Sequence, residues 1–192
     1  VTSSGKTEIY IHLIQKHLEA GNQVLYLLPE IALTTQIITR LKAVFGNKVG
    51  IYHSKFNDAE RVEVYSKVRK FDTAPEESYP VVLGVRSSVF LPFSKLGLII
   101  VDEEHENTYK QYDPAPRYHA RDSAIVLAGM HKANVLLGTA TPSIESYFNA
   151  RSGKYAFVEL TTRFKDIQLP EIHLVDLLEM RRKRRMKSMF TT

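Results

Sequence analysis

The stretch LIIVDEEHE, residues 98–106, decides the fold because four apolar residues lead directly into two adjacent acids, Asp102 and Glu103. A short apolar run of this kind is typical of a strand buried on both faces. In open sheets of parallel strands, ligands bind at the carboxyl ends of the strands. The two acids are therefore predicted to lie at such an edge. Taken alone, the stretch is interpreted more simply as a polar turn after a buried strand.

Helix and strand patterns alternate on both sides of this stretch. Helical spacing of apolar residues predicts helices over residues 6–20, 34–45, 58–68 and 120–131, and from Thr141-Pro142 onward. Short apolar runs predict further strands at residues 23–28, 48–52, 81–85, 134–137 and 155–160. Buried strands separated by helices are typical of a parallel sheet covered on two sides. We therefore predict an α/β fold: a doubly wound, mostly parallel sheet with helices on both faces.

The composition fits one domain. The chain has 192 residues, of which 44% are hydrophobic and 24% charged, as in ordinary globular proteins. We expect residues 1–175 to form one lobe and residues 176–192 to form a basic segment leading out of it. Six positive charges lie in residues 181–187, and without them 20 basic residues face 21 acids, a balance of −1. The net charge of +5 is therefore weak evidence for nucleic-acid binding.

Membrane and metal signals are sparse. No apolar run approaches the roughly 20 residues that a membrane span needs, so no membrane partner is expected. The absence of cysteine excludes disulfides and thiolate metal sites, and is compatible with a reducing, cytoplasmic location. The seven histidines form no metal-binding pattern, and His12 and His17 lie on different faces of one predicted helix.

The opening VTSSGKTE, residues 1–8, matches the end of a phosphate-binding loop, whose pattern is Gly, four residues, then Gly-Lys-Ser/Thr. The first Gly would precede Val1, so the loop is expected to be truncated at its N-terminus. In such loops backbone N–H groups surround the phosphates, Lys6 would reach the β- and γ-phosphates, and the Thr7 hydroxyl would bind Mg²⁺. Ser4 and Gly5 complete the predicted phosphate contacts. A Ser-rich helix cap is the alternative interpretation.

The two motifs support each other. Thr7 and Asp102 are 95 residues apart, which accommodates about three βαβ repeats and can bring their strands together. Asp102 would then hold Mg²⁺ through its water shell, and Glu103 would polarise the water that attacks a γ-phosphate. Together the motifs favour a nucleotide site over a plain cap and a plain turn.

Seven segments, in this order, resemble the first motor lobe of superfamily 2 helicases, a RecA-like P-loop NTPase lobe: VTSSGKTE, LLPEIALTTQ, YHS, GVRSSVFLPF, VDEEHE, YKQYDPAPRYHARD and GTATPSIES. Among these helicases, the chain is similar over nearly its whole length to the PriA-type primosomal proteins, the bacterial replication-restart helicases. The resemblance implies an ATP-dependent 3′-to-5′ DNA helicase, with single-stranded and forked DNA and replication-restart proteins as partners. The cofactors it implies are ATP and Mg²⁺. The zinc of that family belongs to a later insertion, so none is expected in this segment.

The resemblance also implies roles for particular residues. Lys6, Asp102 and Glu103 would be catalytic, Asp102 as the metal carboxylate and Glu103 as the base. Coupling of hydrolysis to movement would involve His105, Thr139 and Thr141. Contacts to the single strand would come from Pro29, Glu30, Thr34, Arg86 and Ser87. A helix entry at Pro29-Glu30 and a cap at Thr139 and Thr141 are the simpler alternatives.

Residues 107–118 are rich in tyrosines and cations. Side chains of this kind stack on bases and pair with phosphates, at about 1–3 kcal/mol per stacked base. The resembled helicases use an aromatic loop after the DEEH-type box to sense DNA. The candidate contacts in this chain are Tyr109, Lys110, Tyr112, Arg117 and Tyr118. The prolines at 114 and 116 leave open which residues stack, and a tyrosine-rich surface or core edge is the alternative.

Other functions fit parts of the pattern. Another superfamily 2 translocase, such as an RNA helicase or a restriction translocase, would keep the ATP chemistry and change the substrate. A P-loop kinase would be expected to show an arginine-rich lid, which the sequence lacks. A non-enzymatic interaction module would tolerate loss of Lys6 or Glu103. In the resembled family a second lobe supplies an arginine finger, so we expect this segment alone to hydrolyse ATP poorly or not at all.

Overall fold

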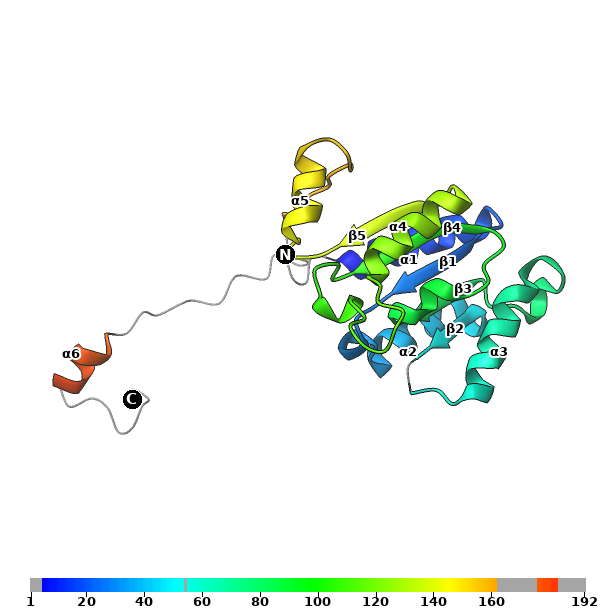
Figure 1. Ribbon diagram of the computed structural model, residues 1–192, viewed down its shortest axis with the longest axis horizontal. Helices are drawn as coiled ribbons and strands as arrows, with labels where there is room; N and C mark the ends of the chain where they lie inside the picture. The colour runs from blue at the N-terminus through cyan, green and yellow to red at the C-terminus, as the bar shows by residue number, and fades with distance from the viewer. Residues whose placement is uncertain (1–4, 54, 162–175, 183–192) are drawn as a thin grey trace.

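The computed structural model describes residues 5–53, 55–161 and 176–182. Five strands form one sheet in the order β2-β3-β1-β4-β5, and every neighbouring pair is parallel (Figure 1). The strands are β1 (Gln23–Leu27), β2 (Val49–Tyr52), β3 (Val81–Gly84), β4 (Leu96–Asp102) and β5 (Asn134–Gly138). The predicted α/β fold with a parallel sheet is confirmed.

The α-helices lie before, between and after these strands. They are α1 (Lys6–Glu19), α2 (Thr35–Phe45), α3 (Asp58–Arg69), α4 (Ala120–His131), α5 (Ile144–Arg151) and α6 (Leu177–Arg182). Short 3₁₀ turns add η1 (Glu30–Ala32), η2 (Gly46–Lys48), η3 (Lys70–Asp72), η4 (Pro75–Glu77), η5 (Arg86–Phe90) and η6 (Asn107–Tyr109). Among the described residues, no helix is long and apolar enough to cross a membrane.

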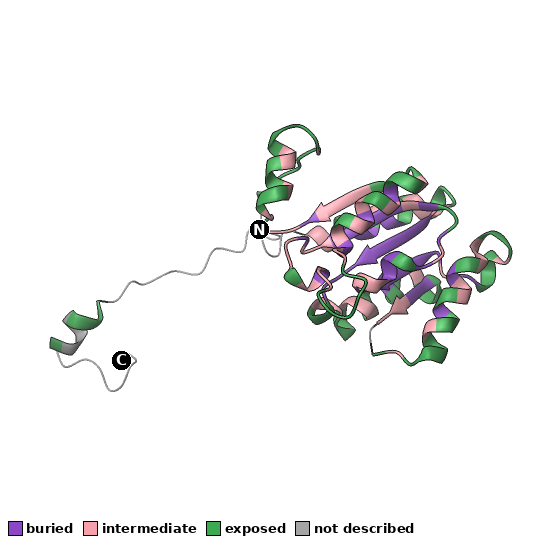
Figure 2. Ribbon diagram, in the orientation of Figure 1, coloured by how far each residue is buried: buried purple, intermediate pink, exposed green. Residues whose placement is uncertain are grey.

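Two apolar clusters cover the two faces of the sheet, as the alternation of side chains along each strand requires. On one face, Leu25 and Ile99 pack with apolar residues of α3 and α4. On the other face, Tyr26 and Ile100 pack with residues of α1 and α2. The central strand β1 is buried along its whole length (Figure 2). Helices on both faces confirm the doubly wound arrangement.

Two predictions about the end of the lobe are wrong. Residues 155–160 form no strand, and Phe157 and Val158 are 54% and 83% exposed. An apolar run becomes a strand only where a neighbouring strand offers hydrogen bonds, and this run has no partner among the described residues. The predicted start of the last helix at Thr141-Pro142 is two residues early, because α5 begins at Ile144 with Ser143 as its N-cap. The proposed segment boundary at residue 175 lies outside the described residues, although α6 falls within residues 176–192.

Candidate functional site

The candidate residues gather at one edge of the sheet. Because all five strands are parallel, their carboxyl ends meet there. Pro29 and Glu30 follow β1, and Arg86 and Ser87 follow β3. Asp102 ends β4, Glu103 follows it, and Thr139 follows β5. Segments far apart in the sequence are therefore brought to a common surface.

Lys6 reaches the acids at the end of β4. Its Nζ donates a hydrogen bond to Glu103 Oε1 at 2.7 Å and lies 3.7 Å from Asp102 Oδ1. Lys6 is the first residue of α1, and the preceding Gly5 has φ of 83°, a left-handed conformation that glycine adopts without strain. Thr7 is half-buried in the same first turn. Ser4 lies outside the described residues. The phosphate-loop motif and the strand-end acids, which the sequence analysis expected to lie together, are adjacent in space.

Two buried tyrosines hold the Asp102 carboxylate. The Tyr10 hydroxyl donates to Oδ1 at 3.1 Å, and the Tyr26 hydroxyl donates to Oδ2 at 3.2 Å. Their rings pack edge to face, with centroids 5.5 Å apart. Burial, and then the charge of Asp102, raises the pKa of both phenols, so both stay protonated as donors. Asp102 is thereby fixed in one orientation at the surface.

Gly138 leaves room for this arrangement. A Cβ at Gly138 would overlap with the Tyr10 hydroxyl and lie 2.9 Å from its Cζ. We expect Gly138→Ala to lower the free energy of unfolding by about 1–3 kcal/mol, because the Tyr10 ring must shift from Asp102. The matched substitution is Gly129→Ala in α4, where no atom lies within 4 Å of the new methyl group. It should raise stability by about 0.5–1 kcal/mol. Urea unfolding of both variants checks this, and equal effects would contradict it.

The backbone turns sharply at Glu103. Its φ of 47° is in the left-handed region, which is unusual for a residue with a side chain. The Glu103 N–H donates to Asp102 Oδ1 at 3.1 Å, and the Glu103 carbonyl accepts from the N–H of Glu106 at 2.9 Å. This turn directs the Glu103 carboxylate toward Lys6 and away from the core.

The three predicted coupling residues lie together. His105 Nδ1 is 2.8 Å from Thr139 Oγ1, and His105 Nε2 is 3.3 Å from Thr141 Oγ1. The Thr139 hydroxyl also accepts from the Thr141 N–H at 3.0 Å. A single imidazole therefore bridges the box after β4 and the turn after β5. The structure brings these residues together, and their role in coupling stays a prediction.

Residues 107–118, which we call the aromatic loop, form a loop whose two ends lie side by side. An antiparallel bridge between Lys110 and His119 closes its base, supported by the Gln111 N–H donating to the Tyr118 carbonyl at 2.9 Å. Residues 112–117 are exposed, and Tyr112 is 67% exposed. The ring of Tyr118 packs edge to face on Phe90, centroids 4.9 Å apart. Lys110, Tyr112, Arg117 and Tyr118 stay candidates for nucleic-acid contact.

Two predicted nucleic-acid contacts do not fit the structure. Tyr109 is 1% exposed, and its hydroxyl donates to the carbonyls of Leu27 at 3.1 Å and Asp102 at 2.6 Å. Its ring has no free face on which a base could stack, so it anchors the start of the loop to β1 and β4. Pro29 is also buried. The pattern of aromatics among cations does not distinguish an exposed tyrosine from one that fills a core edge.

The other predicted nucleic-acid residues are accessible. Arg86 and Ser87 are half-buried, and Arg86 Nη1 donates to the Thr108 carbonyl at 3.3 Å. Glu30 and Thr34 are exposed, and Thr34 is the residue before α2. Phe90 ends the same segment, is 60% exposed and packs edge to face on Tyr118.

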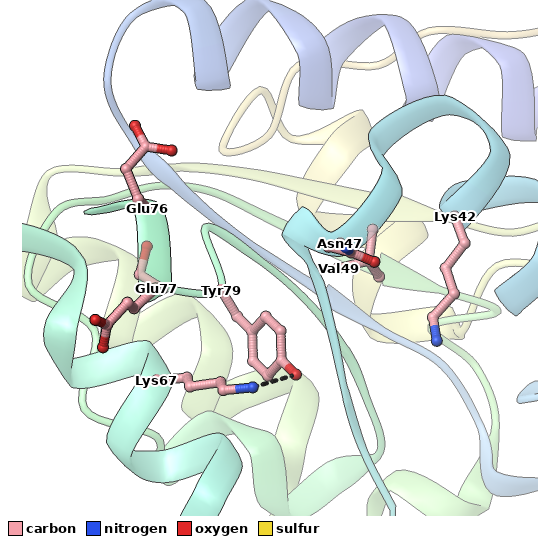
Figure 3. Close-up of a pocket in the computed structure, with 8 residues that line it drawn as sticks. Lys42, Asn47, Val49, Lys67, Glu76, Glu77 and Tyr79 are labelled. Atoms are coloured by element: carbon pink, nitrogen blue, oxygen red, sulfur yellow. Dashed lines mark hydrogen bonds between the residues drawn. The ribbon is translucent and has the colours of Figure 1, made fainter. Parts of the chain in front are cut away.

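A cavity of about 470 Å³ lies elsewhere, at the starts of β2 and β3 (Figure 3). It is lined by Lys42, Asn47, Val49, Lys67, Glu76, Glu77, Ser78 and Tyr79. Lys67 Nζ donates to the Tyr79 hydroxyl at 3.1 Å, as Figure 3 shows, and pairs with Glu63 at 2.7 Å. None of the candidate residues lines this cavity, so it is separate from the site at the carboxyl edge.

The residues present fit a nucleotide with a magnesium ion. A helix N-terminus beginning after a left-handed glycine, with Lys6 in its first turn, suits phosphate oxygens. Thr7 and Asp102 offer oxygen ligands, and Mg²⁺ typically takes only one or two protein ligands beside phosphates and waters. Within residues 5–53, 55–161 and 176–182, no group of three or more His, Cys, Asp or Glu side chains could hold a metal ion.

The fold and this site together define an α/β lobe of the RecA-like type, in which a loop lysine meets paired acids at the carboxyl edge of a parallel sheet. The family model described as DEAD/DEAH box helicase matches residues 1–149 of the chain. The chain belongs to the DEAD/DEAH box helicase family.

Within this helicase family, the chain is similar to several curated proteins that share one name. The chain is 47% identical over 177 residues to the replication restart protein PriA of Rickettsia conorii, covering 92% of this chain and 26% of that protein. It is 43% identical over 179 residues to the replication restart protein PriA of Bacillus subtilis, covering 93% of this chain and 21% of the relative. The protein of the same name from Chlamydia pneumoniae is 43% identical over 191 residues. The chain spans about a quarter of the length of these relatives.

Proposed function

We propose that the chain is the ATP-binding motor lobe of an ATP-dependent 3′-to-5′ DNA helicase that acts in replication restart and primosome assembly. The observation that carries the proposal is the contact between Lys6 Nζ and Glu103 Oε1 at 2.7 Å, beside Asp102. This contact supports the proposal, because it joins the predicted phosphate-loop lysine to the predicted acids in a lobe of the helicase family. The similarity to relatives named for replication restart supports the biological setting.

ATP and Mg²⁺, when bound, supply the phosphoryl group that is transferred to water and the positive charge that stabilises it. In the structure the Glu103 carboxylate pairs with Lys6 through Oε1 at 2.7 Å. With a nucleotide bound, Lys6 would contact phosphate oxygens and Glu103 would orient water as the base. Asp102, held by Tyr10 and Tyr26, and the Thr7 hydroxyl would provide oxygen ligands to the metal.

The proposal also covers the partners of the lobe and its location in the cell. Single-stranded and forked DNA would lie along the carboxyl edge between the aromatic loop and the segment after β3. The second motor lobe would close the nucleotide site, and replication-restart proteins would be further partners in the cytoplasm. Exposed Tyr112 and Arg117 offer a stacking ring and a cation on this side of the lobe.

The test is the rate of ATP hydrolysis by the full-length protein with no nucleic acid, with single-stranded DNA, with forked DNA and with RNA. We expect stimulation by both DNAs and little by RNA. Stimulation by RNA alone would support an RNA helicase instead. Phosphorylation of an acceptor without nucleic acid would support a kinase.

The DNA side of the site is tested with Tyr112→Ala. Loss of one stacked base costs about 1–3 kcal/mol, so the affinity for single-stranded DNA is expected to fall about fivefold or more. The matched control is Tyr65→Ala, which removes a ring that is also exposed but lies on α3. Fluorescence anisotropy with labelled single-stranded DNA measures both. Equal affinities for the two variants would exclude Tyr112 as a stacking residue.

A further inference from the structure

Resting on the proposed function, we propose that Tyr10 and Tyr26 are positioning residues that set the ion preference of the nucleotide site, favouring Mg²⁺ over Ca²⁺. The hydroxyls of both tyrosines donate to the carboxylate of Asp102, the acid predicted to serve the metal ion. The two phenols leave this carboxylate little capacity for direct contact with an ion. The site therefore favours an ion that keeps its own waters.

The two tyrosines are core residues whose hydroxyls reach the carboxyl edge of the sheet. Tyr10 is 3% exposed and Tyr26 is fully buried, whereas the Asp102 side chain is 15% exposed. Phenylalanine would fill the same apolar space, so packing alone does not require the hydroxyls. A buried hydroxyl costs free energy unless it finds a hydrogen-bond partner. Both hydroxyls share one partner, a carboxylate that is itself partly accessible to water.

Most of the accepting capacity of the Asp102 carboxylate is used within the protein. A carboxylate has about four lone-pair sites. Oδ1 accepts from the Tyr10 hydroxyl at 3.1 Å and from the Glu103 N–H at 3.1 Å, and Oδ2 accepts from the Tyr26 hydroxyl at 3.2 Å. Lys6 Nζ adds a positive charge 3.7 Å from Oδ1. The carboxylate therefore has about one site left for a further contact.

The two phenols approach from different elements, so the carboxylate cannot rotate to free an oxygen without breaking one of these bonds. Tyr10 lies one turn after Lys6 in α1, and both side chains reach Asp102 from the same helix. Tyr26 lies in β1, where the register pairs it with Ile100 of β4. The edge-to-face packing of the two rings holds each phenol in place.

A carboxylate held at both oxygens distinguishes between divalent ions. Ca²⁺ takes about six to eight oxygen ligands, and carboxylates bind it directly through one or both oxygens. Mg²⁺ loses its waters reluctantly and usually keeps several of them. One remaining site on Asp102 is enough to accept a hydrogen bond from such a water. It does not suffice for a carboxylate that binds through both oxygens.

The phenols should therefore affect the two ions unequally. Removing a hydrogen bond that orients a metal-site carboxylate typically costs about 10–100-fold in metal affinity. For Mg²⁺ we expect a loss of this kind, because the carboxylate is no longer held where the waters of the ion meet it. For Ca²⁺ the oxygen that is freed becomes available for direct contact, which offsets the loss.

The experiment uses the full-length protein with Tyr10→Phe and with Tyr26→Phe, each of which removes one hydroxyl and keeps the ring. Binding of a fluorescent ATP analogue is measured without metal, with Mg²⁺ and with Ca²⁺, together with thermal unfolding. We expect the affinity without metal to stay within about twofold. The gain in affinity from Mg²⁺ should fall about tenfold, while the gain from Ca²⁺ stays within about threefold. If one variant does not fold, the other decides.

The matched control is Tyr109→Phe, which removes a similarly buried phenol hydroxyl at the same edge. The Tyr109 hydroxyl donates to the backbone carbonyls of Leu27 and Asp102 and makes no bond to the carboxylate. This variant should lose stability as the other two do, because each loses buried hydrogen bonds. Its preference for Mg²⁺ over Ca²⁺ should equal that of the unmodified protein.

The outcomes separate the inference from the proposed function. An unchanged preference in Tyr10→Phe and Tyr26→Phe overturns the inference alone. Losses that are equal for the two ions, or larger for Ca²⁺, also overturn it, and so does the same change in Tyr109→Phe, because the hydroxyls would then be only structural. A comparable loss of affinity without metal would mean that the tyrosines support the phosphate loop instead. No nucleotide binding by the unmodified protein with either ion overturns the proposed function, and the inference with it.

Discussion

Replacing Glu103 with Gln in the full-length protein is expected to lower the turnover number for ATP by about 10²–10⁴-fold, the usual contribution of a positioned general base. Gln has the same shape and its carbonyl oxygen still accepts from Lys6, whose Nζ lies 2.7 Å from Glu103 Oε1. It cannot take a proton from water. Because the Lys6 contact survives, ATP affinity should change little. Phosphate release at saturating ATP and DNA measures the loss.

The matched control for this substitution is Glu145→Gln, at an exposed acid of α5 that takes no part in the site. Its turnover should equal that of the unmodified protein. If Glu103→Gln retains more than about a tenth of the turnover, Glu103 is not the base. A loss of ATP binding instead would mean that the carboxylate acts mainly by holding Lys6.

Much of the fold follows from local sequence, because strands buried on both faces are uniformly apolar. Residues 98–101 and 23–27 needed no further information to be recognised as strands. Residues 155–160 look equally suitable by composition, yet they remain without a pairing strand in the described structure. Apolar composition records what a segment can do, whereas strand formation also depends on a neighbour that the segment's own residues do not specify.

In the candidate site, too, some residues could be predicted from the sequence and others could not. Lys6 and Asp102 could be placed together because a phosphate loop and a strand-end acid follow a known pairing rule. Tyr26 could not, because its hydroxyl reaches Asp102 only through the register that pairs Tyr26 with Ile100. Glu104 was visible within the box, but its partner Arg121 lies 17 residues away across the aromatic loop. Register and loop path are tertiary properties, so sequence pattern alone missed both.

Replacing Lys6 with Ala is expected to weaken ATP binding and to lower hydrolysis by about 10²–10³-fold, the typical cost of removing one preorganised electrostatic donor. In the structure Lys6 lies within 3.7 Å of both acids, so it is the cation that offsets their mutual repulsion. Without it, two neighbouring carboxylates confront a triphosphate. Binding of a fluorescent ATP analogue and phosphate release measure the two effects separately.

Comparison with the Glu103 substitution makes the result specific. Lys6→Ala should lose nucleotide affinity, whereas Glu103→Gln should lose turnover and keep affinity. Because the two side chains contact each other, the double variant is expected to be far less impaired than the product of the two single losses. Lys16→Ala, at an exposed lysine on the same helix, is the control and should be unaffected. Unchanged nucleotide affinity in Lys6→Ala would contradict the assignment of this lysine to the phosphates.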